Sequence, residues 1–148
     1  MKITCKHCGI VEKPHRCPKI SKEKRNRIDS KAYSKRGYKT VRSLVLENHN
    51  FLDLYSLFVE SKYITANITH HIIEVLEDES KAEDYDNLIP VSKESHDKIH
   101  ELYKIDKNSM QKLLVNMLKD YANGEKTLGK YKEEIKKICE KNWVPPYI

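Results

Sequence analysis

Apolar residues recur every three or four positions in several parts of the chain, which predicts amphipathic helices. In segment 34–48 the apolar side chains of Tyr38, Val41 and Val45 fall on one face. A dense apolar stretch follows at 51–59 and is expected to form a short helix or a helix that turns into a strand. Similar stripes predict three later helices, at 93–105, 109–121 and 127–142.

A different pattern separates the early and late helices. Segment 64–75 mixes β-branched residues with two adjacent histidines and is interpreted as a strand, and 88–91 is a short apolar run that predicts a return strand. Pro90 suits an edge or a strand end because proline has no N–H to donate. The acidic segment between the two strands is interpreted as a solvated loop. Ser92 is a suitable N-cap for the helix at 93–105.

Length and composition favour one modest domain. The chain has 148 residues, 34% of them charged and 39% hydrophobic, so any core is small and a bound metal would help to stabilise it. It contains neither an apolar run of about 20 residues nor the apolar core of a signal peptide, so we expect no membrane partner and a cytoplasmic location, in a host cell if the gene is viral. In that reducing setting the four cysteines are better explained as metal ligands or free thiols than as disulfides.

The net charge of +6 is unevenly distributed. Segment 19–39 contains nine Lys or Arg residues and two acidic ones, so the net charge of this segment exceeds the net charge of the whole chain. Such a basic segment is typical of a nucleic-acid binder, and it is equally typical of a solvated linker or an exposed helix. Charge alone leaves both interpretations open.

The histidines indicate chemistry more specifically. Imidazole is a common metal ligand and a common general base near neutral pH. Adjacent side chains on a strand point in opposite directions, so His70 and His71 can serve different functions. His96 and His100 are four residues apart and share one face of the predicted helix. Three imidazoles could hold a divalent cation while the fourth deprotonates a water, and Asn87 could hold the loop closed; phosphodiester hydrolysis needs this combination.

Three stretches, 68–73, 86–90 and 95–100, resemble the HNH endonucleases, which have a ββα-metal (His-Me finger) core. They are most similar to the small bacteriophage versions, and the histidine pattern is also similar to that of the nuclease colicins. The intervals of 16, 9 and 4 residues separate His71, Asn87, His96 and His100. A weaker similarity extends upstream, where 34–42 resembles the basic helix that often precedes the motif.

The resemblance implies a role for each residue. His70 and His96 would be metal ligands, His71 the general base and Asn87 the residue that positions it, while His100 would be a third ligand or a phosphate contact. An imidazole-rich site favours Zn²⁺, Ni²⁺ or Mn²⁺ over Mg²⁺. The candidate contacts to nucleic acid are Arg36, Lys39, Arg42, Lys93 and Lys98.

One departure from the family concerns a structural zinc that many relatives bind through two Cys-x-x-Cys pairs. Ser92 and Ser95 occupy the expected places of the second pair, and apolar residues near Leu52 and Tyr55 those of the first. We therefore expect no zinc in the core, with packing in its place. The packing residues would be Phe51, Leu54 and Phe58.

The N-terminus predicts a separate metal site. The pair Cys5 and Cys8 has the Cys-x-x-Cys spacing that suits tetrahedral zinc. His15 and Cys17 would complete a closed structural site, although His7 or Cys139 are alternatives for the fourth ligand. A reduced, metal-free arm is the competing interpretation.

The expected protein is an α+β nuclease with flanking helices that hydrolyses double-stranded DNA, in phage homing or packaging. A zinc-containing DNA-binding protein without catalysis, and an RNase with the same core, are the alternatives. The apolar face at 110–118 would serve a core or a homodimer, and packaging proteins are further candidate partners. The expected organisation is an arm at 1–18, a basic linker at 19–33, a nuclease domain at 34–105 and a helical extension at 106–148.

Overall fold

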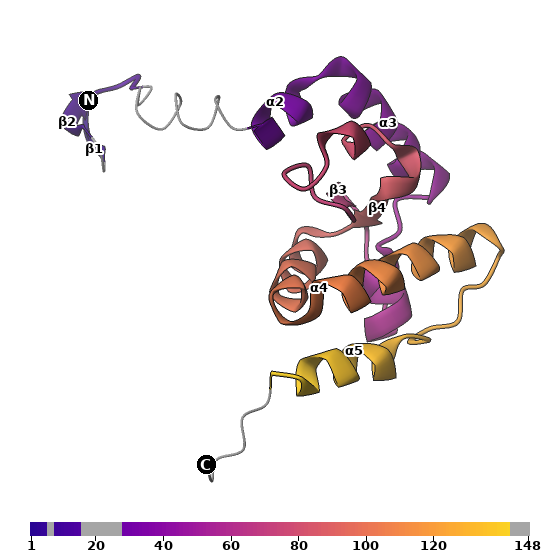
Figure 1. The fold of residues 1–148 in the computed structure, drawn as a ribbon. Helices are drawn as coiled ribbons and strands as arrows, with labels where there is room; N and C mark the ends of the chain where they lie inside the picture. Colours follow the sequence, from indigo (N-terminus) through magenta and orange to yellow (C-terminus); the bar gives the residue numbers. More distant parts are fainter. Residues whose placement is uncertain (6–7, 16–27, 143–148) are drawn as a thin grey trace, which may run out of the picture.

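The computed structural model describes residues 1–5, 8–15 and 28–142 of the chain. Within these residues the fold is a mixed α/β arrangement of helices and two small antiparallel sheets (Figure 1). The elements are β1 (Lys2–Cys5), β2 (Gly9–Glu12), α2 (Ile28–Ser34), α3 (Arg36–Asn48), the π-helical turn η1 (Ser56–Glu60), β3 (Ile68–His71), the 3-10 turns η2 (Glu79–Lys81) and η3 (Tyr85–Asn87), β4 (Leu88–Val91), α4 (Lys93–Ala122) and α5 (Lys132–Glu140).

The central hairpin consists of β3 and β4, with His70 opposite Ile89 and His71 opposite Leu88. The return strand at 88–91 is confirmed at the predicted bounds, and all its residues are buried. The first strand is shorter than the predicted 64–75, because β4 offers only four residues for pairing. The hairpin therefore ends at the two histidines.

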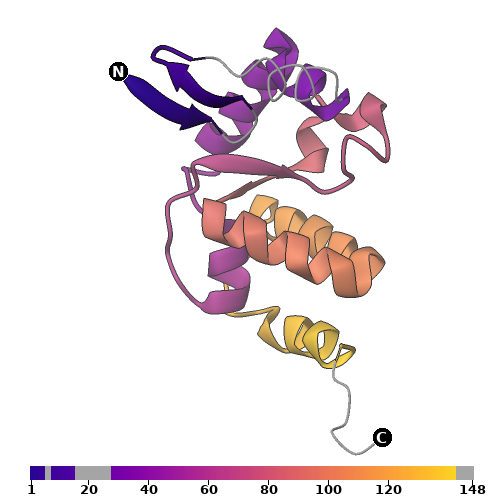
Figure 2. The same ribbon diagram turned by 90° about the vertical axis from the view of Figure 1, so that its left-hand side faces the viewer.

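Two apolar clusters hold the hairpin between helices (Figure 2). The larger cluster fills the space between the hairpin, η1, α4 and α5, and includes Leu54, Phe58, Ile89, Ile99 and Leu114. A smaller one joins Tyr38 and Val45 of α3 to Leu88 of β4. The strands thus have α3 on one side and α4 on the other, which allows the two histidines to face different helices.

Helix α4 contains the predicted break between 105 and 109. Asp106 has φ −151° and ψ 85°, outside the helical region, and its carboxylate accepts hydrogen bonds from the backbone N–H (3.1 Å) and hydroxyl (2.8 Å) of Ser109. The side chain therefore caps the second helical segment where the first one ends. Ser92 is confirmed as the N-cap of the first segment, since its hydroxyl accepts from the N–H of Ser95.

A buried carboxylate occupies the place where packing was expected instead of zinc. Asp53 is fully buried and accepts hydrogen bonds from the backbone N–H of Ser56 and Ser92, both at 2.9 Å, and from the hydroxyls of Ser56 (3.0 Å) and Ser95 (2.5 Å). The residues form two pairs, 53 with 56 and 92 with 95, each with the Cys-x-x-Cys spacing. Of the residues expected to pack in place of zinc, Leu54 and Phe58 are fully buried in the core and Phe51 is 48% exposed, so the carboxylate network adds to the packing of the first two.

Two elements, α5 and the segment expected to be a basic linker, differ from the prediction in their bounds or their secondary structure. Helix α5 begins at Lys132 and not near Thr127, because Gly129 has φ +69° and the N–H groups of Gly129 and Tyr131 bond to the carbonyls of Leu57 and Phe58. Part of the expected basic linker, at 28–34, is the helix α2. No helix in the described part of the chain is long and apolar enough to cross a membrane.

Candidate active site

The two adjacent histidines at the end of β3 point to opposite sides of the hairpin. Both are buried, with 2% of His70 and 4% of His71 exposed. The ring of His70 lies among side chains of α4, whereas the ring of His71 stacks on Tyr38 of α3, with centroids 5.4 Å apart and planes 22° from parallel. The alternation expected of a strand thus separates the two imidazoles.

His70, His96 and His100 form a cluster in which one ring nitrogen from each lies within 4.8 Å of the others. The Nε2 atoms of His96 and His100 are 3.2 Å apart, and the His70 ring centroid lies 5.4 Å and 5.0 Å from those of the other two. The one-turn spacing on α4 brings the second pair together, and the hairpin supplies the third ring. The cluster could hold a metal ion.

Burial and neighbouring rings favour the neutral form of His70 and His96. Burial lowers the pKa of His70 well below its ordinary value, and the neighbouring His100 and His96 lower it further. Burial and His100 also lower the pKa of His96. Neutral imidazoles offer lone pairs, which is the form that binds a cation.

The tautomer of His70 is fixed by Tyr103. The Tyr103 hydroxyl donates its hydrogen to the carbonyl of Ile72 at 2.7 Å, so at its 3.1 Å contact with Nε2 of His70 the same oxygen must accept. His70 therefore carries its hydrogen on Nε2 and has its lone pair on Nδ1. A partner that fixes the outer nitrogen of a metal-binding histidine orients the ring and raises its basicity as a ligand.

His71 is held in the complementary way by a backbone carbonyl. Its Nε2–H donates to the carbonyl of Ala82 at 2.9 Å, while its Nδ1 is buried with no hydrogen-bond partner among the described residues. Burial lowers the pKa of His71, and the hydrogen bond to Ala82 partly opposes this effect. The ring is thus neutral near pH 7 with an unpaired lone pair, which is the form required of a general base.

Asn87 closes the loop that supplies this carbonyl. Its Oδ1 accepts from the N–H of Ile73 at 2.8 Å, and its Nδ2 donates to the carbonyls of Ile73 (3.0 Å) and Lys81 (3.2 Å). Lys81 precedes Ala82, so the amide fixes the carbonyl that bonds to His71. The structure places Asn87 behind His71 and does not bring it into direct hydrogen-bond contact with the ring.

A single cavity of about 260 Å³ joins His71 to the three-histidine cluster. Four further residues line it, Tyr33, Glu74, Val75 and Leu76. A carboxylate oxygen of Glu74 is 3.6 Å from Nδ1 of His100, and the Tyr33 ring meets that of His71 edge-on at 5.4 Å. Only the fold places these two here: Glu74 follows the end of β3, in a segment that the sequence predicted as strand, and Tyr33 lies on α2.

The five basic candidates have different surroundings. Arg42 donates to the carbonyl of Asn67 at 2.6 Å, Lys93 pairs with Asp97 at 2.5 Å, and Lys98 pairs with Glu60. These three make contacts within the protein. Arg36 and Lys39 are exposed on α3 and form no ion pair with the part of the chain that the structure describes.

The N-terminal hairpin brings together three of its four predicted ligands. The side-chain ligand atoms of Cys5, Cys8 and His15 lie within 4.8 Å of one another. The turn between β1 and β2 ends at Gly9, whose φ of +79° a residue with a side chain rarely adopts. The Nε2 of His15 is buried without a hydrogen-bond partner among the described residues. Cys17 and the alternative His7 lie outside the described residues, and the other alternative, Cys139, is exposed on α5 and is not part of this group.

Comparison with known proteins gives one clear similarity. No family model and no curated protein matches the chain. Among solved structures, the HNH endonuclease of the deep-sea thermophilic bacteriophage GVE2, determined with a manganese ion, is 31% identical. The match has a TM-score of 0.50 and covers 60% of this chain and 96% of the phage protein. With nearly the whole of that protein matched at this identity, the chain belongs to the HNH endonuclease family.

Proposed function

We propose that the protein is a metal-dependent endonuclease that hydrolyses phosphodiester bonds in DNA, with β3, β4 and the first half of α4 as its ββα-metal core. One observation carries the proposal. His71, whose Nδ1 has no hydrogen-bond partner among the described residues, lines the same cavity as the His70, His96 and His100 cluster, so a base and a cation site would face one reacting group.

The residues of the cluster fit a divalent cation. Three imidazoles would supply three ligands and would leave coordination positions for a phosphate oxygen and water, as a catalytic site requires. When bound, such an ion neutralises charge that develops on the phosphate and on the leaving oxygen. The manganese ion of the phage neighbour supports a divalent metal in this family, and imidazole ligands favour a transition metal over Mg²⁺.

His71 acts as the general base in this proposal. Its Nδ1 takes a proton from a water whose oxygen attacks the phosphorus, and the bond from phosphorus to the 3′ oxygen breaks. The departing 3′ oxygen takes a proton from a solvent water. The products are a 5′ phosphate and a 3′ hydroxyl. The hydrogen bond to Ala82 and the stacking on Tyr38 hold the ring while the proton moves, and Asn87 positions the loop that carries Ala82.

The exposed Arg36 and Lys39 support a nucleic-acid substrate, because they lie on the same helix as Tyr38, which packs against the base. The resemblance to HNH endonucleases makes DNA the proposed nucleic acid. Cationic side chains beside the site would contact phosphates of the strand that is cut. Both residues are exposed, so the contact would cost no buried ion pair.

A plasmid-nicking assay tests the proposal. We expect conversion of supercoiled DNA to nicked or linear forms with Mn²⁺, loss of cleavage in EDTA, and recovery when the metal is restored. Competing duplex RNA should reduce the rate less than the same amount of duplex DNA. Cleavage that persists in EDTA would contradict the metal site, and stronger competition by RNA would make the protein an RNase.

We further propose that the N-terminal arm holds a structural zinc ion. Two thiolates and a buried, unpartnered imidazole nitrogen within 4.8 Å of one another are a suitable tetrahedral donor set, with Cys17 as the proposed fourth ligand. The arm at 1–18 would then be a small module joined by a basic segment to the nuclease domain at 34–105 and its extension at 106–148.

Metal content tests this site separately. The protein should retain about one zinc per chain after dialysis, and Cys8→Ser should lose it. Cys139→Ser is the matched control, since this thiol is exposed on α5 and should leave the zinc in place. A dialysed wild-type protein without zinc would contradict the proposal.

A further inference from the structure

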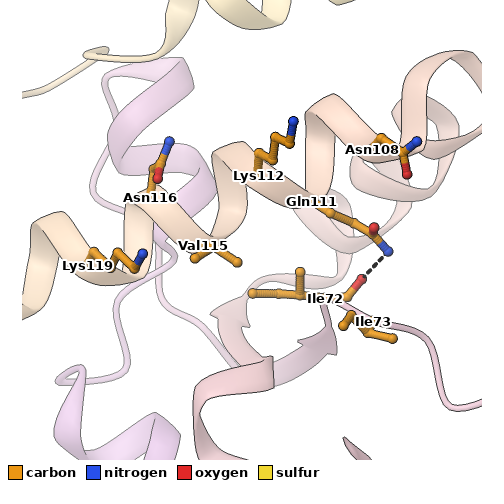
Figure 3. A pocket seen from close by; sticks show the side chains of 8 residues that line it. All are labelled: Ile72, Ile73, Asn108, Gln111, Lys112, Val115, Asn116 and Lys119. Carbon is orange, nitrogen blue, oxygen red and sulfur yellow. Dashed lines mark hydrogen bonds between the residues drawn. The ribbon is translucent and has the colours of Figure 1, made fainter. Parts of the chain in front are cut away.

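A second cavity lies beside the candidate active site and not in it. It has a volume of about 490 Å³ and runs along the second half of α4 (Figure 3). Its floor includes Ile72 and Ile73, which directly follow the two adjacent histidines in the chain. We call it the α4 groove.

Apart from Val115, the side chains that line the groove on α4 are polar or cationic. They share one side of the helix. They are Asn108, Gln111, Lys112, Asn116 and Lys119. No carboxylate is among the lining residues, although Gln111 donates to the carboxylate of Glu77 at 3.4 Å as well as to the carbonyl of Ile72, so the two lysines and the two asparagines are the donors that the groove offers.

The two lysines of the groove form no ion pair with the described residues, in contrast to Lys104 and Lys107 on the same helix. Lys104 pairs with Glu101 at 2.7 Å, and Lys107 pairs with Glu77 at 2.5 Å and with Glu74. Lys112 and Lys119 are exposed and form no ion pair with any residue that the structure describes. Their charges are therefore available to an anion from outside.

A hydrogen-bond chain connects the groove to the candidate metal cluster. The carbonyl of Ile72 accepts from the Tyr103 hydroxyl, which contacts His70, and also from the amide nitrogen of Gln111 at 3.0 Å (Figure 3). The Tyr103 hydroxyl and one backbone carbonyl thus lie between the proposed cation ligand His70 and the groove residue Gln111.

From this arrangement we infer that the α4 groove binds the sugar-phosphate backbone of the nucleic-acid substrate on one side of the bond that is cut. The inference extends the proposed nuclease function. Lys112 and Lys119 are seven positions apart on the helix, a rise of about 10 Å, which equals about three base-pair steps measured along the axis of duplex DNA. Lysine and asparagine side chains are ordinary phosphate contacts, and such contacts position the duplex without reading its sequence.

The test measures binding without cleavage. Duplex DNA with a fluorescent label is titrated in EDTA with the full chain, with the double variant Lys112→Gln and Lys119→Gln, and with a control. The matched control is Lys132→Gln with Lys136→Gln, two exposed lysines of α5, which lies on the other side of α4 from the hairpin (Figure 2). Both variants lose two charges.

Each lost phosphate contact lowers the slope of log K against log salt concentration by about 1. We therefore expect the groove variant to bind all duplex sequences more weakly, with a slope about 2 smaller, and the control to keep the wild-type slope. The double variant Lys112→Arg and Lys119→Arg should also keep the wild-type slope, because both charges remain.

Equal slopes for the groove variant and the control would overturn the inference, as would a wild-type protein that does not bind DNA. Neither measurement depends on hydrolysis. A protein that cleaves plasmid DNA but shows no groove effect would refute only the groove, whereas one that binds through the groove without cleaving would refute only the nuclease proposal.

Discussion

Tyr103 contacts His70 through an oxygen that has already donated its hydrogen elsewhere. The hydroxyl lies 2.7 Å from the carbonyl of Ile72 and 3.1 Å from Nε2 of His70. The direction of the first bond fixes that of the second, and with it the nitrogen of His70 that faces the cluster.

Tyr103→Phe should therefore weaken metal binding while the fold remains. The phenyl ring preserves the packing, but His70 loses the acceptor that selects its tautomer. Loss of such an outer partner lowers metal affinity by roughly 10- to 100-fold. Calorimetric titration with Mn²⁺ measures the metal affinity. Tyr121→Phe is the control, because the Tyr121 hydroxyl donates to the carbonyl of His49 and is not near the cluster. Equal affinities would show that Tyr103 does not orient the ligand.

His71→Ala should abolish cleavage and leave metal binding intact. A general base contributes about 10²- to 10⁴-fold in rate, and the His71 ring is not part of the metal cluster. The contrasting variant His96→Ala should lose both cleavage and metal affinity. Rates of plasmid nicking and Mn²⁺ titration separate the two effects. Full activity of His71→Ala would remove it from the proposed role.

Asn87→Ala should reduce both stability and cleavage. It removes a donor and an acceptor that serve three backbone groups, and a buried group left without a partner costs about 1–3 kcal/mol. The released loop also no longer fixes the Ala82 carbonyl that bonds to His71. Thermal unfolding and nicking rates measure the two consequences. Asn48→Ala, at an exposed amide that bonds only to the Tyr85 hydroxyl, should change neither.

Asp53→Ala should destabilise the fold strongly. The carboxylate accepts from two backbone N–H groups and two hydroxyls in the interior, and its removal leaves these donors unpaired. We expect a loss of at least about 3 kcal/mol in the free energy of unfolding, measured with urea. Asp53→Asn, which keeps one acceptor oxygen, should lose less. A variant with wild-type stability would show that the hydrogen bonds among these four residues do not stabilise the fold.

The break in α4 should make stability depend on pH in the acid range. Hydrogen bonds from Lys141 and Ser109 lower the pKa of Asp106 to about 2 from an ordinary value of 3.8. Because the folded state holds this proton less tightly, the contribution of Asp106 is complete above about pH 4 and is lost as the pH falls towards 2. Urea unfolding between pH 5 and 2 should show a shallower pH dependence for Asp106→Asn than for the wild type. Parallel curves would contradict this contribution.

The sequence by itself determined the local elements and the chemical types at the site. Apolar spacing located α3, both halves of α4 and the strand at 88–91, because these patterns reflect which face of each element is buried. The spacing of His96 and His100 already placed both rings on one helical face. The Cys-x-x-Cys pair likewise predicted the group that the N-terminal hairpin assembles with His15.

Tertiary structure decided what depends on residues far apart in the chain. The ring of Tyr103 reaches His70, the carbonyl of Ala82 reaches His71, and Glu74 enters the cavity, although no local pattern marks these partners. The same holds for Asp53, which through two of its four hydrogen bonds reaches Ser92 and Ser95, about 40 positions away, and so adds to the core packing that the sequence predicted. The spacing of apolar residues indicates which face of a segment is buried in the core. The direction of a lone pair depends instead on groups that are far apart in the chain and that only the fold brings together.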